Sequence, residues 1–173
     1  MKRILSLSMA VFATASMALA QGGGQMASPP DSATGKVGSA TVTINYNSPS
    51  LKGRAIGNEL APYGKVWRAG ANKATTITTD KDLTVGGKKL PAGKYSLYAL
   101  PTQNEWKFML NSQAGQWGIM RDGSSTMDST KNVAVVTSKP MKSSSPHERL
   151  VYEVTGKGIV MKWGDVEVPI PMK

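Results

Sequence analysis

Residues 40–46 read Ala-Thr-Val-Thr-Ile-Asn-Tyr, and apolar and polar side chains alternate through the whole stretch. Alternation with a period of two is typical of a β-strand that has one buried face and one exposed face. A similar pattern returns at residues 105–111, with Trp106, Phe108 and Leu110 on the inward face. Both stretches therefore predict half-buried strands.

The rest of the chain predicts further short strands. Gly86-Gly87 separates two of them, and a glycine pair permits the positive φ angles of a two-residue hairpin turn. No stretch after residue 20 shows a sustained helical period. The additional predicted strands are residues 74–79, 83–85, 88–90, 95–100, 132–137 and 149–155, followed by 159–163 and 166–170 on either side of a tight turn at Gly164-Asp165.

About nine short strands at hairpin spacing, with Gly and Pro turns between them, indicate an antiparallel all-β domain. Residues 97–100 and 133–136 look buried on both faces, which favours a β-sandwich over a barrel. No internal repeat of fixed period is present, which argues against a propeller. We therefore predict a single antiparallel β-sandwich over residues 37–173, with long ordered loops.

The N-terminus has the pattern of an export signal. Lys2 and Arg3 precede a mostly apolar core at residues 4–15, which is too short to span a membrane as a helix. Ala18-Leu19-Ala20 then fits a small-x-small cleavage site. Residues 1–20 are therefore predicted to be a signal peptide, with an uncleaved anchor as the alternative. We expect a periplasmic or secreted protein with no transmembrane segment after cleavage.

Two other segments are predicted to lie outside regular structure. Residues 21–36 are rich in Gly, Ser and Pro, a composition that buries little apolar surface and is typical of a flexible leader. Residues 139–146 contain a run of three serines and are predicted to be a linker.

The composition limits the chemistry. The chain has no cysteine and one histidine, His147, so thiol chemistry is absent and a metal site or a Ser-His-Asp triad is difficult to assemble. The net charge of +10 is compatible with an anionic partner, although the lysines are spread along the chain. No motif for nucleic-acid recognition is present. We expect no metal, no cofactor and no nucleic-acid partner.

Residues 48–76 show neither helical nor strand periodicity and are predicted to be a long ordered loop. Loops of this length in compact domains are usually functional. A second irregular stretch covers residues 115–131. Together the two stretches supply six candidate binding residues, which are Arg54, Trp67, Arg68, Asn72, Lys73 and Trp117.

These residue types suit a shallow site for a small anion or an envelope glycan. The planar fork of an arginine matches a carboxylate or phosphate at two points. Glycines beside it allow backbone N–H groups to approach an anion closely. Trp67 and Trp117 offer flat faces for a sugar or an aromatic ligand. The leading prediction is therefore an exported, non-catalytic binding or interaction domain.

Two alternatives remain open at this point. In a purely structural envelope protein, the arginines would satisfy loop carbonyls and Trp67 would cover the end of the core. In a carboxylate-dependent hydrolase, Glu59, Asp122 and Asp128 are the acids in irregular segments, but no pair stands out. Two arginines, two tryptophans and an asparagine are more than loop closure requires, which favours binding.

Three motifs are similar to a bacterial family catalogued as a domain of unknown function, family 2911. They are Gly53-Arg-Ala-Ile-Gly57, the segment from Pro62 to Thr76, and the segment from Leu90 to Leu97. The resemblance extends roughly from Gly38 to the C-terminus. It implies an exported all-β domain and supplies no reaction.

Overall fold

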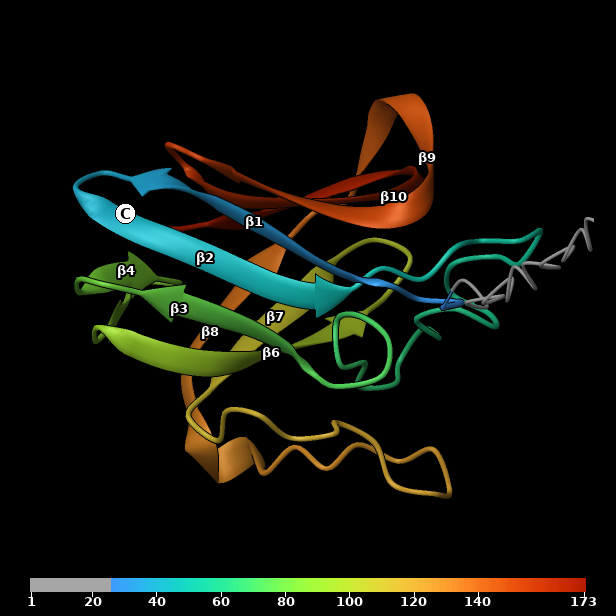
Figure 1. Ribbon diagram of the computed structural model, residues 1–173, viewed down its shortest axis with the longest axis horizontal. Coiled ribbons are helices and arrows are strands. Elements are labelled where there is room, and N and C mark those ends of the chain that lie inside the picture. The colour runs from blue at the N-terminus through green and yellow to red at the C-terminus, as the bar shows by residue number, and fades with distance from the viewer. Residues whose placement is uncertain (1–25) are drawn as a thin grey trace, which may run out of the picture.

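The structure is a computed structural model that describes residues 26–173, and this part of the chain contains ten β-strands and no α-helix (Figure 1). The predicted signal peptide and residues 21–25 lie outside the described residues. The elements are β1 (Pro30–Val37), β2 (Ala40–Asn47), β3 (Thr75–Thr79), β4 (Leu83–Val85), β5 (Lys88–Leu90), β6 (Gly93–Pro101), β7 (Trp106–Asn111), the 3₁₀ helix η1 (Ser129–Lys131), β8 (Asn132–Ser138), β9 (Met141–Thr155) and β10 (Gly158–Pro171).

The larger layer is a six-stranded antiparallel sheet with the order β1-β2-β3-β6-β7-β8. β6 lies between β3 and β7, the central position that its apolar sequence predicts. In β2, Val42 and Ile44 are fully buried, whereas Thr43 and Asn45 lie on the outer face. The alternation in residues 40–46 therefore sets which face of the sheet packs on the core.

The second layer is a long ribbon of β9 and β10, which covers the inner face of the sheet (Figure 1). Phe108 of the sheet and Leu150 and Trp163 of the ribbon belong to one buried cluster between the two layers. Burial of this apolar surface is the main stabilising contribution to the fold. The predicted antiparallel, sandwich-like all-β fold is confirmed.

The hairpin of β4 and β5 turns at Gly86 and Gly87, whose φ angles are 56° and 75°. Both positive values match the predicted two-residue turn. The hairpin packs against β8, the outermost strand of the large sheet. It therefore covers part of an edge that would otherwise be open.

The predicted leader extends too far. β1 begins at Pro30 and pairs with β2 along its whole length, from Pro30 opposite Asn47 to Val37 opposite Ala40. Gly35 shows why composition was misleading, because a Cβ there would lie 2.9 Å from the Cβ of Val154 in β9. This glycine permits close packing of two strands rather than flexibility.

Two further boundaries differ from the prediction. Residues 141–146 of the predicted linker form the first part of β9, and Met141 pairs with Glu167 of β10. The predicted tight turn at Gly164-Asp165 is a bulge inside β10, with register shifts on both sides of Gly164. A bulge bends a strand without reversing it, so β10 continues to Pro171.

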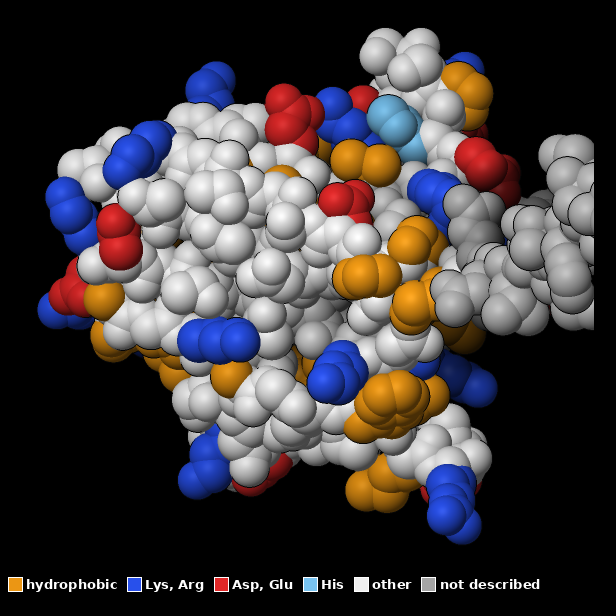
Figure 2. Space-filling model, in the orientation of Figure 1, with side chains coloured by type: hydrophobic (Ala, Val, Ile, Leu, Met, Phe, Trp, Pro, Cys, Tyr) orange, Lys and Arg blue, Asp and Glu red, His pale blue; other side chains and the backbone are white. Residues whose placement is uncertain are grey.

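The outer face of the large sheet has two different regions. Over β6 and β7, Tyr98 and Met109 are buried beneath Val66 and Met127 of the two loops. Over β1 and β2 the outer face is exposed, and Figure 2 shows it largely without charged or hydrophobic side chains. No helix among residues 26–173 is long and apolar enough to cross a membrane.

Candidate functional site

The loop between β2 and β3 lies at the end of the sandwich where the described chain begins (Figure 1). Trp67 pairs with Ala99 of β6 through two backbone hydrogen bonds, of 2.7 and 2.8 Å, and Leu51 N–H donates to the carbonyl of Glu148 in β9 at 2.8 Å. These bonds tie the loop to both layers. The predicted long loop is therefore ordered.

The loop also contains strained backbone. Within residues 26–173, every non-glycine residue with positive φ lies in this loop: Lys52, Ala61, Ala69 and Asn72, with φ between 45° and 57°. Left-handed conformations cost a residue with a Cβ roughly 1–2 kcal/mol. Such strain persists where the surrounding structure imposes it, and it gathers at binding sites.

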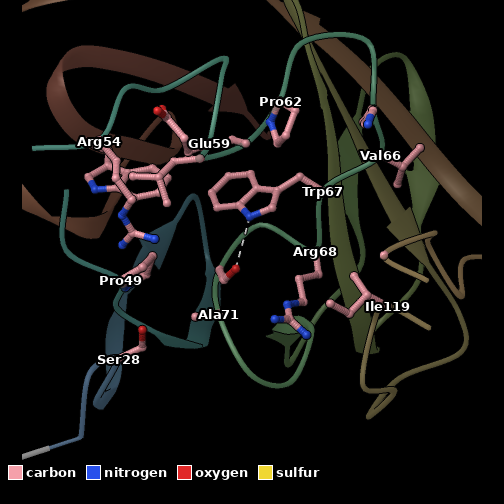
Figure 3. A pocket seen from close by; sticks show the side chains of 16 residues that line it. Ser28, Pro49, Arg54, Glu59, Pro62, Val66, Trp67, Arg68, Ala71 and Ile119 are labelled. Atoms are coloured by element: carbon pink, nitrogen blue, oxygen red, sulfur yellow. Dashed lines mark hydrogen bonds between the residues drawn. The ribbon is translucent and has the colours of Figure 1, made fainter. Parts of the chain in front are cut away.

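The loop, the adjoining segment at Ser28 and β10 surround a pocket of about 300 Å³, which we call the loop pocket (Figure 3). Its polar lining is mostly basic, and the remaining lining is largely small or apolar. The side chains that matter for its chemistry are Arg54, Lys65, Arg68, Glu59, Trp67 and Trp163.

Trp67 lies between Arg54 and Arg68 in the loop pocket (Figure 3). Its ring stacks on Trp163, with centroids 5.6 Å apart and an interplanar angle of 16°, and its edge meets Trp106. Its Nε1–H donates to the carbonyl of Gly70 at 3.1 Å. The indole is therefore fixed in place as a rigid flat surface.

Arg54 combines a structural role with a possible contact in the pocket. Its Nε–H donates to the carbonyl of Leu51 at 3.1 Å, and its Nη2 donates to the carbonyl of Ser50 at 2.8 Å. The side chain thereby supports the loop, as the structural alternative predicts. Three of the five guanidinium N–H groups are not engaged by these bonds.

Arg68 is held much less completely. Its Nη1 donates to the carbonyl of Trp117 at 3.3 Å, and its Cζ lies 5.7 Å from the centroid of the Trp117 ring. Partial burial lowers the pKa of the Arg68 guanidinium below its ordinary value, because the charge has lost solvent. The ion pairs among residues 26–173 involve neither Arg54 nor Arg68.

Trp163 is a lining residue that the sequence indicates only as a core residue. It is 1% exposed, and its Nε1–H has no acceptor among the described residues. A buried N–H without an acceptor costs roughly 1–3 kcal/mol. Its place in an alternating strand predicts burial, but not that the ring borders a pocket.

The other predicted site residues have different positions. Asn72 does not line the loop pocket, and its Nδ2 donates to the carbonyl of Ser28 at 3.3 Å. Lys73 lines a second pocket nearby. Trp117 is 54% exposed and lies against Arg68. The structure therefore brings Arg54, Trp67 and Arg68 into one pocket, and places Lys73 beside it.

The loop carboxylates are arranged as local caps. Glu59 accepts from the backbone N–H of Ala55 at 3.1 Å, Asp122 from that of Ser124 at 2.9 Å, and Asp128 from that of Thr130 at 2.9 Å. Backbone hydrogen bonds lower the pKa of Glu59, and side-chain hydroxyl and backbone hydrogen bonds lower the pKa values of Asp122 and Asp128. A glycosidase needs a carboxyl group with a raised pKa as its acid.

We expect Tyr152→Phe to lower Tm by about 2–4 °C, from the loss of one hydrogen bond worth about 1 kcal/mol. The buried Tyr152 hydroxyl donates to the carbonyl of Ala69 at 2.8 Å and so ties β9 to the loop. The loss stays small because the Thr75 hydroxyl donates to the same carbonyl at 2.7 Å. Differential scanning calorimetry measures it, and a fall above 10 °C would contradict this shared-acceptor arrangement.

Comparison with known proteins gives one family and no characterised relative. The family model described as "Protein of unknown function (DUF2911)" matches residues 28–172. Searches of curated proteins and of solved structures found no significant match.

Proposed function

The chain belongs to the DUF2911 family, a family of proteins of unknown function, and we propose from the geometry of the loop pocket that it is a non-catalytic binding domain. Its ligand is a small molecule that carries a carboxylate, and an acidic sugar is the class that fits the pocket best. We also propose that it acts in the periplasm or outside the cell, on the basis of the export signal at residues 1–20.

Arg68 is the observation that carries this proposal. The single bond to Trp117 leaves four of its five N–H donors, including the parallel pair on Nε and Nη2. A carboxylate accepts from such a pair at two points, and charge-assisted bonds of this kind are the strong ones. The partly desolvated charge has no carboxylate partner in residues 26–173. An anionic ligand would supply one.

Trp67 and the small lining residues favour a sugar over a bare inorganic anion. The fixed indole lies between the two arginines and offers a flat apolar surface to a pyranose ring (Figure 3). The pocket volume of about 300 Å³ lies at the lower end of the range for small-molecule sites. One sugar unit with one carboxylate matches both features.

The carboxylates give less support to a hydrolase. Glu59 is the acidic side chain that lines the loop pocket, and its pKa is lowered. Retaining and inverting glycosidases both use two carboxyl groups across the scissile bond. A ligand that binds and leaves unchanged is therefore the proposed outcome.

The test is isothermal titration of the mature chain with glucuronate and with glucose. We expect glucuronate alone to bind, and Arg68→Ala to weaken binding by about 10- to 100-fold, since a bond to a charged group is worth about 1.5–3 kcal/mol. Arg121→Ala removes an exposed arginine from the neighbouring loop and serves as the matched control. It should bind glucuronate as the unaltered chain does.

The melting temperature separates binding from scaffolding. Under the proposal, Arg68→Ala retains Tm within about 3 °C, because only one 3.3 Å bond to protein is lost. A large fall in Tm, together with no glucuronate binding by the unaltered chain, would replace the proposal with the structural role. Turnover of a uronide would replace it with the hydrolase.

A further inference from the structure

A second pocket, of about 320 Å³, lies beside the loop pocket at the end of the exposed sheet face. We call it the sheet pocket. Its lining is polar and includes two lysines from different elements, Lys73 of the loop and Lys94 of β6. Asn45, Thr76 and Asp31 also line it.

The sheet pocket has a net positive lining. Lys73 and Lys94 are exposed, and neither belongs to an ion pair within residues 26–173. Asp31 is the acidic residue of the pocket, and its Oδ2 accepts a 2.7 Å hydrogen bond from the Tyr46 hydroxyl while its Oδ1 accepts from Ser32 N–H. The local charges therefore favour an anion here as well.

A narrow ridge separates the two pockets. Ala71 lines the loop pocket and Lys73 lines the sheet pocket, so the pockets are separated by two steps of the chain, about 7 Å. Ser28 and Pro30 are divided in the same way.

The ridge is held rigidly. The carbonyl of Ser28 accepts from the side-chain amide of Asn72 at 3.3 Å and from that of Asn47 at 3.1 Å. Asn72 has φ of 57°, a conformation that asparagine tolerates better than most residues. The predicted polar residue Asn72 thus positions the ridge between the pockets rather than contacting the contents of either one.

We infer that the ligand is an extended anionic glycan, which crosses the ridge and presents one acidic unit to the loop pocket and another to the sheet pocket. This inference rests on the proposed function. A uronate polymer carries a carboxylate on each unit and hydroxyl groups between them. The carboxylates suit Lys73 and Lys94, and the hydroxyls suit Asn45 and Thr76.

The experiment is titration with oligogalacturonates of one, two, four and six units. We expect the six-unit chain to bind at least about tenfold more tightly than the monomer, since linked contacts add avidity. Lys73→Ala/Lys94→Ala should remove most of this gain and leave the monomer affinity within about twofold. The matched control, Lys88→Ala/Lys107→Ala, removes two exposed lysines from β5 and β7 and should retain the gain.

The outcomes separate this inference from the proposed function. If Arg68→Ala abolishes monomer binding but Lys73→Ala/Lys94→Ala leaves the six-unit affinity unchanged, the inference fails and the proposed function stands. An equal loss in the control pair would mean attraction by overall charge and would also overturn the inference. If no uronate of any length binds the unaltered chain, both are overturned.

Discussion

Gly86→Ala is expected to lower Tm by about 10 °C, and Gly87→Ala by about 3 °C. Both glycines have positive φ, so alanine costs each roughly 1 kcal/mol in backbone strain. At Gly86 the added Cβ would also overlap the carbonyl oxygen of Val135 in β8, whereas at Gly87 it would meet nothing within 4 Å. Overpacking of this kind adds roughly 1–3 kcal/mol, and each kcal/mol shifts Tm by about 2–4 °C in a domain of this size.

The pair of variants tests how the hairpin of β4 and β5 sits on the large sheet. Calorimetry of both proteins under one condition measures the difference. Because the two positions share one turn, the φ contribution is similar in both and the excess reports contact with β8. Equal losses would mean that the hairpin does not pack on β8 as described.

Trp67→Ala is expected to lower Tm by about 10 °C and to abolish glucuronate binding. The change removes the stacking on Trp163 and the edge contact with Trp106, and truncation of a large aromatic side chain in a core typically costs about 3–5 kcal/mol. It also removes the flat surface between the arginines. Thermal melts and titration measure the two effects.

Two controls keep this prediction specific. Trp67→Phe retains an aromatic ring beside Trp163 and loses the bond to Gly70, so its Tm should fall by only a few degrees. Trp117→Ala removes a tryptophan that is 54% exposed, and its Tm should change little. If Trp67→Ala melted like the unaltered chain, the loop would not be anchored through this residue.

Local pattern was sufficient for most of the strands. Alternation in β2 and β7, and the glycine pair between β4 and β5, are properties of a few neighbouring residues, so they can be identified without the fold. β1 and the start of β9 have Gly-, Ser- and Pro-containing sequences that read as flexible. Their structure comes from distant partners, β2 and β10, which local composition does not identify.

The candidate site shows the same division. The residue types of Arg54, Trp67 and Arg68 indicate an anion and sugar site, and the structure places all three in one pocket. That Arg54 is partly bound to loop carbonyls while Arg68 is not depends on the loop path. The participation of Trp163 depends on two strands meeting through space.

The central claim is that the Arg68 guanidinium binds the carboxylate of the ligand. Titration of ¹⁵N-labelled protein with glucuronate, followed at the arginine Nε–Hε resonances by NMR, tests it most directly. The account predicts a large, saturable shift at Arg68, a smaller one at Arg54 and none at Arg121. No shift at Arg68, or equal shifts at Arg68 and Arg121, would contradict it.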